Sequence, residues 1–107
     1  MQAVSVGADV DGSLAVVLRG ELDFTNAGEI AAVILESVAD SRPLAVRVDV
    51  AEVSFLDSSG IGVLVHAMRA AEEVSAKFEV QNPRAKVLDQ LRLSGLLEPF
   101  GLSDASG

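Results

Sequence analysis

The middle of the chain carries the stretch that most directly predicts the fold, VRVDVAEVSFLDSSGIGVLVHAM (residues 46–68). Its first part alternates valine with charged residues, as a β-strand with one buried face does. Asp57-Ser58-Ser59-Gly60 follows, and aspartate and serine are residues that cap helices. Apolar residues then recur at helical spacing, at Ile61, Leu64, Val65 and Met68. We therefore expect a strand that leads directly into a helix running to about Glu73.

The residues before this stretch predict a hairpin and a helix. Val4 and Val6 begin a short alternating run, and Asp11-Gly12 is a tight-turn signal ahead of the apolar run 14–18. The first two strands are therefore expected to be antiparallel. After a break at residues 20–23, apolar residues recur every fourth position from Ile30 to Val38, which predicts a helix capped by Thr25.

The residues after it predict one more strand and one more helix. Residues 77–81 alternate in polarity, and Asn82-Pro83 supplies an N-cap and a first-turn proline for a helix that buries Val87, Leu88 and Leu91. Ser94-Gly95 ends this helix, and residues 96–102 form an apolar closing segment. The tail, residues 103–107, is expected to fray.

The order β-β-α-β-α-β-α predicts the α/β class. Right-handed crossovers place the third and fourth strands parallel to the second, in a mixed sheet of four to five strands. The strands at 46–50 and 77–81 alternate rather than being apolar throughout, so we expect helices on one face of the sheet only, with Arg47, Asp49, Lys77 and Glu79 toward solvent. We expect one domain over residues 1–107.

Composition excludes several kinds of chemistry. The chain has 107 residues, no cysteine and one histidine, which removes disulfides, thiolate chemistry and most zinc sites. We expect no metal site and no cofactor. The net charge of -8 disfavours nucleic acid and anionic membrane surfaces as partners. The first residues lack a signal-peptide pattern, and no apolar run is long enough to span a membrane, so a cytoplasmic protein is expected.

The stretch Val48–Leu64 resembles the signature of the STAS domain, as found in bacterial anti-anti-sigma factors (anti-sigma factor antagonists). Gly20-Glu21-Leu22-Asp23 resembles the family's Gly-Glu-(Leu/Ile)-Asp element after the second strand. Asn82-Pro83, followed by a helix that ends near Ser94-Gly95-Leu96, resembles its C-terminal part. The resemblance spans nearly the whole chain and implies a STAS-like fold.

The resemblance also implies a function. In that family the first serine of the Asp-Ser-Ser-Gly element, here Ser58, is phosphorylated by an anti-sigma factor that is also a serine kinase, and a serine phosphatase restores the hydroxyl. Only the unphosphorylated protein binds the anti-sigma factor, and this binding releases the sigma factor. Local sequence alone favours a simpler explanation, in which Asp57 and Ser58 are helix caps, and it is the wider signature that favours the phosphorylation site.

Eight residues form the expected partner-binding surface: Glu21, Asp23, Asp57, Ser59, Gly60, Gly62, Val63 and Ala67. The first two follow the second strand while Ser58 follows the third, and parallel neighbours bring both loops to one sheet edge. Ser59, Val63, Ala67 and Ala70 make a weakly apolar line that we expect to be exposed for docking. The alternatives are turn formation and capping for the acids, and burial of the line beneath the third helix or the closing segment.

Two other classes of function compete. A serine hydrolase is disfavoured because the chain has no Gly-x-Ser-x-Gly elbow, and His66 lies about two turns along the helix from Ser58, facing elsewhere. We therefore expect a protein that is not an enzyme. A STAS subunit of a stress-signalling assembly or of a lipid-transport complex would keep the fold, although such subunits can lack the serine.

Overall fold

The computed structural model describes residues 3–102, and the tail expected to fray lies outside them. Along the chain these residues form, in order, β1 (Val4–Ala8), β2 (Ser13–Leu22), α1 (Ala27–Ser41), β3 (Ala45–Leu56), α2 (Ser58–Glu73), β4 (Lys77–Gln81) and α3 (Ala85–Leu93). This is the order expected from the sequence.

The four strands lie in the sheet order β1-β2-β3-β4. The first pair is antiparallel and the other two pairs are parallel, which confirms the mixed α/β topology. The register of β2 against β3 shifts on both sides of Arg19-Gly20, and Gly20 has a φ of 80°, a conformation that glycine adopts without strain. Beyond these shifts Leu22 lies opposite Leu56, so β2 and β3 end side by side.

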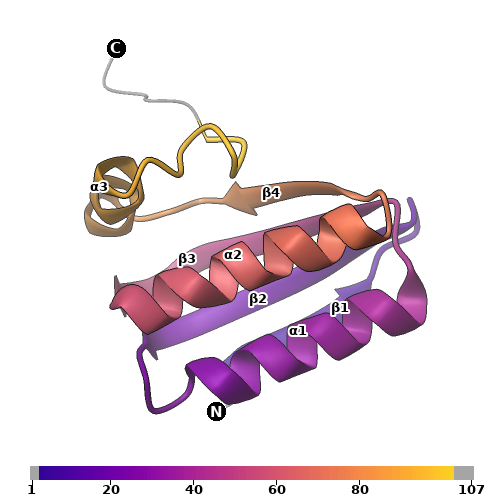
Figure 1. Cartoon of the computed structure of the whole chain (residues 1–107), viewed down its shortest axis with the longest axis horizontal. Helices are drawn as coiled ribbons and strands as arrows, with labels where there is room; N and C mark the ends of the chain where they lie inside the picture. Colours follow the sequence, from indigo (N-terminus) through magenta and orange to yellow (C-terminus); the bar gives the residue numbers. More distant parts are fainter. Residues whose placement is uncertain (1–2, 103–107) are drawn as a thin grey trace.

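Helices α1 and α2 run side by side over one face of the sheet (Figure 1). The core between them and the sheet is fully buried at Val16, Leu18, Val46, Val48 and Ile34, among others. The other face carries the charged residues that the alternation predicted.

On that open face the Arg47 guanidinium lies between two acids. Its Nη1 is 3.2 Å from Oδ2 of Asp11, and its Nε is 3.3 Å from Oε1 of Glu79. The pKa of the Asp11 carboxyl is lowered by hydrogen bonds from Ser13 and by Arg47. These contacts join the hairpin turn to the two parallel strands beside it.

The third helix lies beside the part of β3 that continues beyond the end of β4. Strand β4 pairs only with residues 45–49, and α3 contacts the later part of β3. The side chain of Gln90 bonds both backbone groups of Leu56: Nε2 donates to its carbonyl oxygen at 2.6 Å, and Oε1 accepts from its N–H at 3.4 Å. Gln90 thus takes the place of a neighbouring strand where β3 leads into α2.

The closing segment after α3 folds back onto β4. The Phe100 side chain is fully buried and meets the Phe78 ring edge-on, with centroids 5.7 Å apart. The backbone N–H of Val80 donates to the carbonyl oxygen of Phe100 at 2.9 Å. The apolar pattern of this segment is therefore explained by packing at the sheet edge.

Two expected helix caps are wrong. Helix α1 has Asn26, not Thr25, at its N-cap, and the Asn26 side chain instead bonds the preceding loop. Helix α3 begins at Ala85 with Arg84 at its N-cap, because Asn82 takes a left-handed φ of 60° and turns the chain before Pro83. In both cases the geometry of the loop, and not the capping propensity of a single residue, decides where the helix begins.

Candidate functional site

The candidate site lies where β2 and β3 end next to each other. Because Leu22 and Leu56 are paired, the residues that follow them emerge at the same edge of the sheet. The Asp57 N–H donates to the carbonyl oxygen of Leu22 at 3.1 Å. The two loops expected to form one surface are therefore joined by the backbone itself.

The carboxylate of Asp57 holds this junction together. Its Oδ1 accepts from the Gly60 N–H at 3.0 Å and caps α2, as the sequence predicts. Its Oδ2 accepts from the Phe24 N–H at 3.2 Å, in the loop between β2 and α1. One side chain therefore fixes both the start of α2 and the loop beside it.

Ser58 is the first residue of α2 and is exposed to solvent, whereas Ser59 is half-buried. The first turn of a helix presents N–H groups that have no partner within the helix, together with the positive end of the helix dipole. Ser58 is therefore exposed at the positive end of the helix dipole, next to the Asp57 carboxylate that already accepts from the Gly60 N–H.

Gly60 and Gly62 differ in their surroundings. A β-carbon at Gly60 would lie 2.4 Å from the carbonyl oxygen of Leu22, so only glycine fits there. A β-carbon at Gly62 would meet no atom within 4 Å. The fold thus requires Gly60 to be glycine but leaves room for a side chain at Gly62.

The loop before α1 is acidic and tied by its own side chains. Asp23 accepts hydrogen bonds from the hydroxyl and the N–H of Thr25, and these lower the pKa of its carboxyl. Asn26 donates to the Glu21 carbonyl oxygen at 2.8 Å and accepts from the Asp23 N–H at 3.0 Å. Residues 20–30 and 54–65 together hold four acids and no lysine or arginine. The side chain of Glu21 is exposed at the edge of this surface.

The line of small residues on α2 is not the exposed docking surface expected from the sequence. Val63 is 1% exposed and Ala67 is fully buried, so for these two residues the expectation is wrong. Helix α1 covers them, rather than α3 or the closing segment. The buried stripe of α2 consists of Gly60, Val63, Leu64, Ala67 and Ala71, most of them small, and small residues let the helix approach its neighbours closely.

A shallow groove of about 300 Å³ remains between α1 and α2 next to the site. Ser59 and Gly62 line it on α2, and Ala27, Gly28 and Ala31 line it on α1. The exposed His66 also borders it. Ser59 and Gly62 are thus accessible beside Ser58, while Val63 forms the floor.

Residues 3–102 contain no group of three or more histidine, aspartate or glutamate side chains arranged to hold a metal ion. Within the same residues no helix is both long and apolar enough to cross a membrane.

A family model described as the STAS domain matches residues 7–106. The chain belongs to the STAS domain family. The resemblance seen in the sequence is thereby confirmed over nearly the full length. No curated protein sequence is similar enough to this STAS domain to count as a match.

Several solved structures resemble this STAS domain. The anti-sigma factor antagonist SpoIIAA in its unphosphorylated form is 28% identical, with a TM-score of 0.79 over 92% of this chain and 84% of that one. SpoIIAA, a Bacillus cell fate determinant, in the phosphorylated form gives 26% identity and a TM-score of 0.72 over 92% and 87%. An anti-sigma factor antagonist from Mycobacterium paratuberculosis gives 29% identity and 0.79 over 94% and 84%.

Phe24 is a feature of this STAS domain that sequence reasoning missed. Its side chain is 80% exposed, although it lies only two residues after Leu22, the buried end of β2. A single aromatic residue in a polar loop has no periodic neighbours that would mark it as buried or exposed. Its place beside the start of α2 depends on the hydrogen bond from its N–H to Asp57, a contact between distant parts of the sequence.

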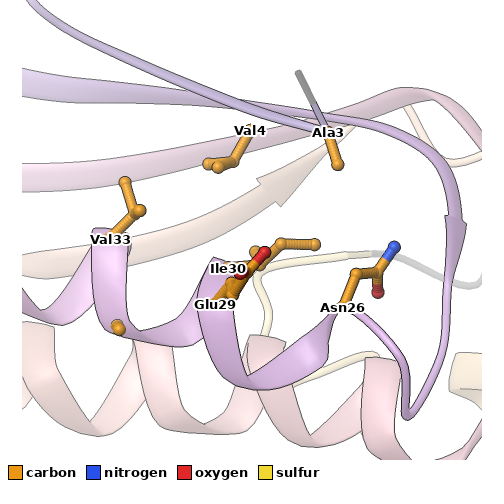
Figure 2. A pocket seen from close by; sticks show the side chains of 7 residues that line it. Ala3, Val4, Asn26, Glu29, Ile30 and Val33 are labelled. Carbon is orange, nitrogen blue, oxygen red and sulfur yellow. The ribbon is translucent and has the colours of Figure 1, made fainter. Parts of the chain in front are cut away.

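A larger hollow of about 630 Å³ lies on the other side of α1, between this helix and β1. Figure 2 shows Ile30 and Val33 of α1 below Val4 of the strand, with Asn26 toward one end. It contains none of the residues expected from the sequence to contact a partner.

Proposed function

We propose that this STAS domain is an anti-sigma factor antagonist that is switched by phosphorylation of Ser58. The unphosphorylated form binds an anti-sigma factor with serine kinase activity, and the sigma factor is released. Phosphorylation ends the binding, and a serine phosphatase restores it. The exposed Ser58 hydroxyl at the start of α2, in a chain similar to known antagonists over 92% of its length, carries the proposal.

Charge explains how one phosphate would act as the switch. Phosphoserine adds about -1.5 to -2 charges at neutral pH. The surface around Ser58 already holds Glu21, Asp23 and Asp57 in two stretches without lysine or arginine. The nearest anion, Asp57, already occupies the N–H groups of Gly60 and Phe24. A phosphate therefore meets like charge, and a partner that packs closely on the hydroxyl would also have to desolvate it.

The chain acts as the substrate of the kinase rather than as an enzyme. The kinase supplies ATP, its metal and the catalytic base. Ser59 and His66 border the same groove, yet they are seven residues apart on one helix, which is about 10.5 Å along its axis. This separation is too long for a hydrogen bond between a nucleophile and its base. Such partners would place the protein in the cytoplasm.

The proposal extends to the remaining surface residues. Glu21 and Asp23 contribute charge, Ser59 and Gly62 are accessible at the groove, and Asp57 with Gly60 shapes the turn on which Ser58 stands. Val63 and Ala67 support this surface from beneath because both are buried.

The test is phosphorylation of the purified protein by anti-sigma kinases from the same genome. Intact mass and fragment mapping should place one phosphate on Ser58, and Ser58→Ala should abolish it while Ser59→Ala does not. Ser58→Ala should bind the kinase permanently, whereas Ser58→Glu should bind it weakly. If no such kinase modifies Ser58, the switch is refuted, and equal affinity of the two variants refutes its electrostatic basis.

A further inference from the structure

We propose that Phe24 is the apolar anchor by which this surface holds its partner, and that the partner offers an apolar pocket rimmed by lysine or arginine side chains. This inference rests on the proposed function and adds to it the chemistry of the contact. It concerns a residue outside the set that the sequence marked.

The exposure of Phe24 is unusual among the phenylalanines of this protein. Of the four phenylalanines, Phe100 is fully buried, and Phe55 and Phe78 are half-buried. Phe24 alone is exposed, at 80%, and its N–H is bonded to Asp57, the residue before Ser58. Aromatic residues at the centre of an interface supply much of the binding free energy, because they bury a large apolar area in a pocket of the partner.

The loop presents this ring from a fixed backbone. The Phe24 N–H is held by Asp57, and the residues on both sides are bonded within the loop, Asp23 to Thr25 and Asn26 to Glu21. A contact residue on an already ordered loop loses little conformational entropy when it binds. The ring is thus ready to insert without rearrangement of the loop.

The charges around the ring define the rim of the pocket. Asp23 precedes Phe24, Asp57 accepts a hydrogen bond from its N–H, and Glu21 lies three residues earlier, next to the end of β2. No lysine or arginine occurs within residues 20–30. Complementary potentials steer association and fix the register of an interface. The partner pocket should therefore be apolar in the centre and cationic at its edge.

The position of Phe24 also makes the contact sensitive to the switch. Asp57 bonds the Phe24 N–H with one oxygen and caps the helix of Ser58 with the other. The loop that carries Phe24 and the first turn of α2 are thus joined through one side chain, so a partner that packs on this loop lies close to the start of α2, where a phosphate on Ser58 would repel a closely packed surface.

The experiment measures binding of the unphosphorylated protein to each anti-sigma serine kinase of the same genome, by calorimetry. Phe24→Ala should weaken binding about 30-fold, the loss typical of an interface hot spot, and Phe24→Leu should weaken it less. Leu93→Ala is the matched control, because Leu93 is 81% exposed on α3 and should leave affinity unchanged within about twofold. The thermal midpoints of all three variants should equal that of the wild type.

The outcomes separate the two proposals. If the wild type binds a kinase and is phosphorylated at Ser58, but Phe24→Ala binds equally well, the anchor is refuted and the proposed function stands. If the wild type neither binds nor is phosphorylated by any of these kinases, the proposed function fails, and the anchor fails with it. Weakening by Leu93→Ala as large as that by Phe24→Ala would also refute the anchor.

Discussion

Gly60 packs against the end of β2 so closely that a β-carbon on it would lie 2.4 Å from the carbonyl oxygen of Leu22 and 2.8 Å from the Leu22 Cβ. The obstacle is backbone, which cannot rotate away as the end of a side chain can. The start of α2, and with it Ser58, is therefore placed by direct contact between a glycine and the neighbouring strand.

Gly60→Ala is expected to destabilise the protein by about 1–3 kcal/mol, because the methyl group forces α2 away from β2. Gly62→Ala is the matched control two residues along the same helix. Its methyl group meets open space, and alanine favours a helix over glycine by roughly 0.5–1 kcal/mol, so this variant should be as stable as the wild type or more so. Urea unfolding measures both, and equal stability of the two variants would contradict the close contact.

Val63→Ala should lower the free energy of unfolding by about 2 kcal/mol, because it removes buried methyl groups beneath α1 and leaves a cavity. Val33→Ala makes the same change on α1, where the side chain is 41% exposed, and should alter stability by no more than about 0.5 kcal/mol. Thermal and urea unfolding of the pair provide the comparison. An unchanged unfolding midpoint for Val63→Ala would show that the Val63 side chain is exposed and not buried beneath α1.

Gln90→Leu should cost about 1–3 kcal/mol of stability, because it leaves the N–H and the carbonyl oxygen of Leu56 without their side-chain partner. The Leu56 amide should then exchange faster with deuterated solvent. Gln81→Leu is the control, since the Gln81 side chain bonds only Glu79, and it should change stability by about 0.5 kcal/mol or less. Unaltered exchange at Leu56 in Gln90→Leu would show that another group holds β3 in place.

At acid pH, the way the free energy of unfolding changes with pH should depend on the hydrogen bonds that the Asp23 carboxyl accepts from Thr25. Hydrogen bonds lower the pKa of Asp23 in the folded state, so their stabilisation is complete above the unfolded value of about 3.9 and is lost as the pH falls through the folded value. Thr25→Ala removes the hydroxyl and should raise this pKa, as followed by NMR titration of the carboxyl.

At pH 6, Thr25→Ala should unfold at a lower urea concentration than the wild type. The difference between the two midpoint concentrations should be smaller at pH 2.5. Ser37→Ala serves as the control, because the Ser37 hydroxyl donates to the carbonyl oxygen of Val33 and not to a carboxylate. Its effect should not change with pH over this range. A Thr25→Ala effect that is equally constant would argue against the link to Asp23.

The sequence predicted most of this fold because its strongest patterns are local. The alternation at 46–50, the turn at Asp11-Gly12 and the cap at Asp57 each depend on neighbouring residues, and the structure contains all three. The caps of α1 and α3 were misplaced because Asn26 and Asn82 serve their loops instead, which is a matter of tertiary geometry.

The surface of α2 was harder to predict for a different reason. Its large apolar residues, Ile61, Leu64, Val65 and Met68, suggested a core face. Leu64 is fully buried, but the other three are only half-buried. The buried centre is built from smaller residues such as Ala67 and Ala71, which let α2 lie close to α1. Hydrophobicity along one helix does not show how near its neighbour will come.

The carbonyl group of Phe100 bonds the outer edge of β4 at Val80. An edge strand with open N–H groups is a template on which a strand from another molecule can add, and it is a common starting point for aggregation. Here the closing segment, residues 96–102, bonds that edge at Val80 and is anchored by the fully buried ring of Phe100. The closing segment therefore protects the edge of β4 from pairing with strands of other molecules. This protection is independent of Ser58 and of the proposed partner surface.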